Sequence, residues 1–149
     1  MTRRALVLVL TGSLSLAGCQ SAREPTSAET MATDVRSADA VLQSGTWKLV
    51  SYVPEVALEP MLATLLQAEV QTMVVRFENG RMKADGPGVH VDRSYRIEQA
   101  WGPRFKLVSV DETGVAYSTT GEISTDGNWI AFVGENKPWR GVGTLHRVP

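Results

Sequence analysis

The chain contains one cysteine, Cys19, and the residues before it suggest a specific chemistry. Residues 5–16 form an apolar run, and the small residues Ala17 and Gly18 separate that run from Cys19. Small side chains at this point leave room for a signal peptidase. A single thiol cannot form an internal disulfide, and a free thiol is a liability in an oxidising compartment. The pattern therefore predicts export and cleavage next to Cys19.

The apolar run is too short to be a permanent membrane anchor. It holds about 12 residues, whereas a membrane-spanning helix needs roughly 20. Arg3 and Arg4 precede it and supply the positive segment of an export signal. We therefore predict that residues 1–18 are a cleavable signal peptide.

The segment Leu16-Ala17-Gly18-Cys19 resembles the lipobox of bacterial lipoproteins. The resemblance implies that the Cys19 thiol carries a diacylglyceryl group and that Cys19 becomes the first residue of the mature chain. One acyl chain holds a protein at a membrane only reversibly, whereas additional chains anchor it stably. Gln20 stands where inner-membrane retention in enteric bacteria typically uses Asp, which implies the outer membrane, facing the periplasm. The alternative is an ordinary signal peptide before an incidental cysteine.

The other reactive side chains form no catalytic or metal-binding pattern. His90 and His146 are the only histidines, and they lie far from each other and from the cysteine, so metal-ligand spacing is absent. Nucleophile-elbow, phosphate-loop and dinucleotide-binding motifs are absent as well. Asp111 and Glu112 adjoin Gly114 and are interpreted as solvated turn residues rather than a catalytic pair. We therefore predict neither enzymatic activity nor a metal or other cofactor.

Charge and composition divide the chain into three segments. The formal net charge is −1 and no basic run is present, which argues against nucleic acid as a partner. Residues 19–44 are rich in small, polar and acidic residues and contain no aromatic residue, so a flexible linker is predicted, and the lipobox resemblance implies that it is lipidated at Cys19. Within this linker, residues 31–42 are expected to form at most a weak helix without a single apolar face. All ten aromatic residues lie between Trp47 and Trp139, which makes residues 45–149 the one folded domain.

Within this domain, apolar side chains recur with the period of two that is typical of strands. Strict alternation in the first strand places Trp47, Leu49, Ser51 and Val53 on one face. Residues 58–70 instead show three- and four-residue spacing, with Pro60 suited to a first helical turn, and predict a helix that serves as a lid or plug. The predicted strands are residues 46–53, 72–78, 81–85, 91–99, 104–110, 115–123, 129–133 and 139–148.

Eight strands joined by short turns predict an all-β fold. We expect an eight-stranded antiparallel up-and-down β-barrel with one helix between strands 1 and 2. Closure removes exposed strand edges, and eight strands leave an interior just large enough for side chains or one small ligand. A two-sheet sandwich is the alternative.

Residues 45–148 resemble a lipocalin-like domain of the calycin group. The resemblance rests on Gly45-Thr46-Trp47-Lys48-Leu49-Val50-Ser51, on the helix that follows, on the Phe77-Glu78-Asn79-Gly80 hairpin and on the terminal Leu145-His146-Arg147-Val148. It implies that Trp47 closes one end of the barrel and that an arginine, either Arg147 or Arg140, packs over it. It also implies a barrel that binds a small hydrophobic ligand.

Two function classes remain after these exclusions, beside a structural protein of the envelope with no small ligand. The first is ligand binding in the barrel of a membrane-anchored envelope lipoprotein, and the second is a non-enzymatic protein-interaction or protease-inhibitor module with an envelope protein as partner. A cavity in the barrel favours the first, whereas a filled barrel with an exposed Trp101 or Trp139 favours the second. The ligand-binding candidates are Trp47, Phe77, Tyr95, Tyr117 and Phe132, and the interaction candidates are Trp101, Trp139 and Arg140.

Overall fold

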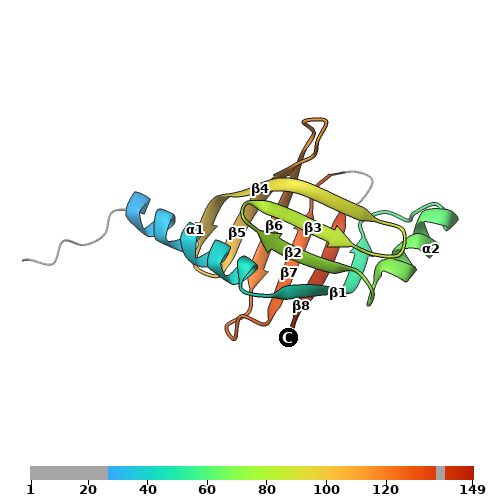
Figure 1. Cartoon of the computed structure of the whole chain (residues 1–149), viewed down its shortest axis with the longest axis horizontal. Helices are drawn as coiled ribbons and strands as arrows, with labels where there is room; N and C mark the ends of the chain where they lie inside the picture. The colour runs from blue at the N-terminus through green and yellow to red at the C-terminus, as the bar shows by residue number, and fades with distance from the viewer. Residues whose placement is uncertain (1–26, 137–139) are drawn as a thin grey trace, which may run out of the picture.

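A computed structural model describes residues 27–136 and 140–149 of the chain. The described residues form two helices and eight strands (Figure 1). The predicted signal peptide, the cleavage motif Leu16, Ala17 and Gly18, the candidate lipid-attachment residue Cys19 and the interaction candidate Trp139 lie outside them. The elements are α1 (Ser27–Gln43), β1 (Thr46–Pro54), α2 (Pro60–Glu69), β2 (Val74–Glu78), β3 (Arg81–Asp85), β4 (His90–Trp101), β5 (Arg104–Val110), β6 (Ala116–Ile123), β7 (Trp129–Gly134) and β8 (Gly141–Val148).

The eight strands close into one antiparallel barrel. Each strand pairs with the next along the chain, and β8 pairs with β1. The β2–β3 connection has positive φ at both Asn79 and Gly80, as a tight hairpin turn requires. The predicted barrel, with α2 between its first two strands, is confirmed.

Strand β1 contains a bulge that changes which of its side chains face the barrel interior. Its register with β8 shifts between Leu49 and Ser51. Trp47 and Leu49 are buried, but after the shift Tyr52 packs against the core and Val53 is 66 % exposed. A bulge adds one residue to one strand of a pair, so the alternation reverses beyond it. The prediction that Ser51 and Val53 share the face of Trp47 is wrong for this reason.

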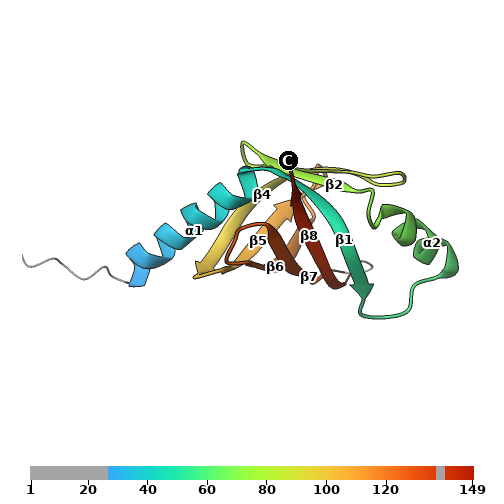
Figure 2. The same cartoon turned by 90° about the horizontal axis from the view of Figure 1, so that it is seen from below.

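The structure differs from the predicted flexible linker over residues 27–43, which form helix α1. This helix lies against one end of the barrel, opposite the end where α2 lies (Figures 1 and 2). Val35, Ala38 and Leu42 recur at three- and four-residue spacing and pack into or against the core. The expectation that residues 31–42 lack a single apolar face is therefore wrong. We refer to the two ends of the barrel as the α1 end and the α2 end.

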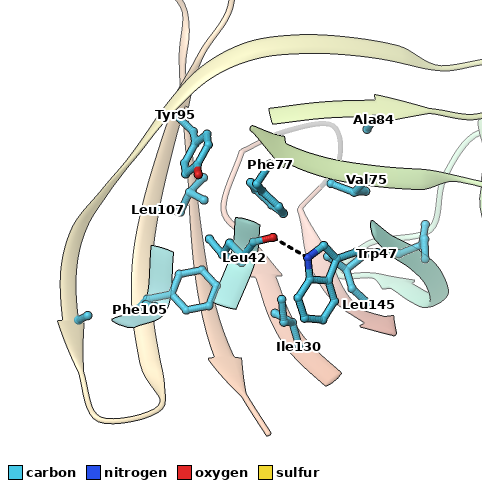
Figure 3. Close-up of a cluster of buried hydrophobic side chains, with 13 residues drawn as sticks. Leu42, Trp47, Val75, Phe77, Ala84, Tyr95, Phe105, Leu107, Ile130 and Leu145 are labelled. Carbon is cyan, nitrogen blue, oxygen red and sulfur yellow. Dashed lines mark hydrogen bonds between the residues drawn. The ribbon is translucent and has the colours of Figure 1, made fainter. Parts of the chain in front are cut away.

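Trp47 fastens α1 to the barrel. Its side chain is 0 % exposed, and its Nε1–H donates to the carbonyl oxygen of Leu42 at 2.9 Å (Figure 3). The final carbonyls of a helix have no intrahelical donor, so this bond satisfies one of them. The guanidinium of Arg147 lies 5.3 Å from the centre of the indole ring. Of the two arginines proposed to cover Trp47, Arg147 is the one that does so, and the α1 end is closed.

Candidate ligand-binding cavity

The barrel interior contains a cavity of about 530 Å³. This volume lies within the range of small-molecule binding pockets. Leu42 of α1 and Leu66 of α2 both contribute to its wall, so the cavity extends between the two ends of the barrel. Its other apolar lining residues are Leu49, Tyr52, Met73, Val75, Phe77, Met82, Ala84, Val89, Val91, Phe105, Leu107, Ile130, Phe132 and Leu145.

Three of the five ligand-binding candidates line this cavity: Phe77, Tyr117 and Phe132. Trp47 and Tyr95 instead belong to the closed α1 end. The ring of Tyr95 packs edge-on against Phe77 with the ring centres 5.2 Å apart, and its hydroxyl donates to Oδ1 of Asp39 in α1 at 2.7 Å. Burial raises the pKa of Tyr95, and the hydrogen bond to Asp39 raises it further. The structure therefore places Trp47 and Tyr95 between α1 and the barrel.

Two phenylalanines lie flat against the barrel wall because glycines face them on neighbouring strands. Phe132 on β7 is paired with Gly143 on β8, and Phe105 on β5 is paired with Gly121 on β6. In each pair, a Cβ on the glycine would overlap the aromatic ring. The missing side chains let the rings occupy the wall of the barrel rather than its centre, which leaves the cavity. Phe105 was not among the candidates from the sequence, because its pairing with Gly121 is evident only from the arrangement of the strands.

Charged lining residues gather at the α2 end. In an up-and-down barrel, alternate connections lie at the same end, so the β1–β2, β3–β4, β5–β6 and β7–β8 connections surround this one. Four acidic or basic residues line the cavity here, namely Glu69, His90, Arg93 and Glu135. The cavity is therefore apolar towards α1 and polar towards α2.

Glu69 joins α2 to the β3–β4 loop. It is only 2 % exposed, and its Oε1 accepts a hydrogen bond from the backbone N–H of Gly88 at 2.7 Å. Its Oε2 is buried against Gly86, where a Cβ would overlap it, and has no hydrogen-bond partner. Together with Leu66, this contact holds α2 over part of the α2 end.

Arg93 is a lining residue that the sequence interpretation missed. Its guanidinium lies 3.6 Å from the centre of the Tyr117 ring, within the range of a cation–π contact. The signal was present in the sequence, because Arg93 lies on the same period-two face as Val91, Tyr95 and Ile97. An arginine on an otherwise apolar strand face indicates a polar position in the interior.

Asp111 organises the β5–β6 turn, in agreement with its interpretation as a turn residue. Its Oδ1 accepts from the backbone N–H and hydroxyl of Thr113 and from the backbone N–H of Val115, and its Oδ2 accepts from the hydroxyl of Tyr117. The hydrogen bond from the Thr113 hydroxyl is the largest of the effects that lower the pKa of Asp111 to about 2. The carboxylate is thus ionised over the physiological range and fixes the Tyr117 ring.

The interaction candidates do not form one site. Trp101 is 46 % exposed beside the β4–β5 turn, where the N–H of Gly102 donates to Oδ2 of Asp34 in α1. Arg140 lies at the α2 end, is exposed and forms an ion pair with Glu55. The two described candidates therefore lie at opposite ends of the barrel.

The described part of the chain holds no group of three or more His, Cys, Asp or Glu side chains suited to a metal ion. Within residues 27–136 and 140–149, no helix is long and apolar enough to cross a membrane. No protein-family model matches the chain, and no curated protein matches it.

Proposed function

We propose that this protein binds a small hydrophobic molecule inside its barrel and is not an enzyme. The observation that carries this proposal is the cavity of about 530 Å³ with a mainly apolar wall. Protein interiors are normally packed as densely as organic crystals and contain few voids larger than a water molecule. An eight-stranded barrel can be filled by its own side chains. Space retained here between Leu42 and Leu66 supports a ligand-binding role.

The lipobox-like segment supports a location in the cell envelope as part of the same proposal. Acylation of Cys19 would anchor this lipocalin-like barrel to the membrane, with the outer membrane as its site and the barrel facing the periplasm. Helix α1 begins at Ser27, close to that anchor in sequence. Residues 20–26 can span at most about 25 Å. The anchor would therefore hold the N-terminal end of α1 near the membrane surface, with the barrel at the other end of this helix (Figure 2).

Substitution of the lipid-attachment residue provides a test of the anchor. We expect Cys19→Ser to move the protein from the membrane fraction to the aqueous fraction of cells and to abolish its labelling by radioactive palmitate, because no other thiol is present to be acylated. Ser21→Ala is the control and should remain in the membrane fraction. If the Cys19→Ser protein stays in the membrane fraction, the anchor is not at this residue.

Ligand binding is tested with the full-length chain that carries Cys19→Ser, which leaves every described residue unchanged. We expect a fluorescent fatty-acid analogue to bind saturably and to quench tryptophan emission, since Trp47 lies close to the α1 end of the cavity. A linear, non-saturating response would remove the ligand-binding proposal.

The exposed ring of Trp101 is the observation that favours the second function, a protein-interaction or inhibitor module. Large aromatic side chains at a surface serve as anchors in protein interfaces. A partner bound there would meet the α1 end of the barrel, so this function does not require the cavity. The cavity makes ligand binding the better-supported proposal.

A further inference from the structure

Arg93 is a charged residue on the inward face of β4, which is an unusual position for an arginine. Along β4, Asp92 and Ser94 are exposed, whereas Val91, Arg93 and Tyr95 are partly or fully buried. Arginine is mostly found at protein surfaces unless it is paired. A guanidinium turned towards an apolar interior therefore needs a compensating partner.

The protein supplies Arg93 with an aromatic platform but with no anion. Its guanidinium rests on the face of Tyr117, whose hydroxyl is held by Asp111. Neither Asp111 nor any other described carboxylate forms an ion pair with it. By contrast, Arg81 on β3 pairs with Asp92, and Arg96 on β4 pairs with Glu98, each at 2.7 Å. None of the N–H donors of Arg93 is both fully buried and without a hydrogen-bond partner in the described residues. These donors therefore remain accessible.

The other acidic and basic residues of the described lining each have a hydrogen-bond or ion-pair partner. Nδ1 of His90 lies 2.6 Å from Oδ1 of Asp85. Glu135 accepts a hydrogen bond from the hydroxyl of Thr120. Glu69 bonds to the loop through Oε1, and its Oε2 is sealed against Gly86. Of the two basic residues in the described lining, His90 has a carboxylate partner and Arg93 has none, so Arg93 is the accessible cation without an anionic partner.

We infer that the ligand is an amphiphile with an anionic head group, a carboxylate or a phosphate ester, that binds Arg93. This inference rests on the proposed function of the cavity. The guanidinium donates its N–H groups to the oxygens of the head group while Tyr117 holds it in place. The apolar chain of the ligand then extends towards Leu42 and Phe105 at the α1 end, where the wall carries no charge.

Calorimetric titration of the full-length Cys19→Ser chain with matched probes tests this inference. Dodecanoate, dodecyl phosphate and dodecanol share one chain length and differ in the head group. We expect both anions to bind about tenfold or more tightly than dodecanol, because a hydrogen bond to a charged group is the stronger kind. The anion that binds more tightly shows whether the site prefers a carboxylate or a phosphate head group.

Substitution of Arg93 separates head-group binding from a structural role. Arg93→Gln should weaken both anions about tenfold or more and leave dodecanol within about twofold. Arg93→Lys retains the charge and should keep a preference for anions, which covers the case in which Arg93→Gln does not fold. Arg96→Gln is the matched control, since it removes the same charge from the outer face of β4, and it should change no affinity.

Two results would overturn the inference while leaving the proposed function intact. One is equal affinity for dodecanoate and dodecanol in the parent chain. The other is an equal loss of affinity for all three probes in Arg93→Gln, which would indicate a purely structural arginine. Absence of saturable binding for every probe would instead remove the proposed function itself, and the inference with it.

Discussion

Replacing Trp47 by alanine is expected to lower the free energy of unfolding by about 3–5 kcal/mol. The indole is 0 % exposed, so its removal leaves a cavity at the α1 end. The carbonyl of Leu42 also loses its hydrogen-bond donor, and Arg147 loses the ring beneath it. For a domain stable by roughly 5–15 kcal/mol, this is a large fraction of the total. Urea unfolding followed by circular dichroism measures the change.

Trp101→Ala is the matched control for this substitution. It makes the same chemical change at a ring that is 46 % exposed, and we expect it to alter stability by at most about 1 kcal/mol. Trp47→Phe should fall between the two, because it keeps most of the apolar volume but not the Nε1–H donor. Equal losses for Trp47→Ala and Trp101→Ala would show that Trp47 does not hold α1 and the barrel together.

Filling the cavity is expected to abolish ligand binding without unfolding the barrel. Ala84 on β3 is buried and lines the cavity beside its strand partner Val75. The indole of Ala84→Trp would occupy space that a ligand needs, so affinity for a fluorescent fatty-acid analogue should fall about a hundredfold or more. Added volume normally destabilises a packed core by about 1–3 kcal/mol, but here the side chain enters existing space. The emission of the probe reports binding, and thermal unfolding reports stability.

Ala131→Trp provides the control for added bulk. Ala131 lies on β7 with its side chain on the exposed face of the barrel, so this variant should bind the probe as the parent chain does. A folded Ala84→Trp protein with unchanged affinity would contradict the proposal, since it would place the ligand outside the cavity.

The barrel was predictable because its signals are local. Alternating side chains mark each strand, and turn residues such as Asn79 and Gly80 require no distant contact to act. Two local features were nevertheless misjudged. The bulge in β1 is evident only from its pairing with β8, which shifts between Leu49 and Ser51. The apolar face of α1 was present in the spacing of Val35, Ala38 and Leu42, but the polar composition of the segment obscured it.

The candidate site was less predictable, because lining a cavity is a property of several strands at once. Tyr95 and Phe77 both face inward, yet Tyr95 is taken up by contact with α1, whereas Phe77 also reaches the cavity. Arg93 carried a readable signal in its period-two position. Its charge is accessible because Asp111 accepts hydrogen bonds within the β5–β6 turn instead of pairing with Arg93. The residue spacing along β4 could not predict this.

By itself, the amino-acid sequence determined the positions of the strands, the short turns that join them and the lipobox-like segment around Cys19. Each of these depends on neighbouring residues, whose backbone preferences and side-chain sizes act over a few positions. Only the tertiary structure decided that the interior contains a cavity and that Arg93 faces it. That outcome depends on pairs such as Phe132 with Gly143, in which a ring lies flat only because a residue from another strand lacks a side chain. Contacts between residues distant in the chain form only when the barrel closes, so local patterns could not reveal them.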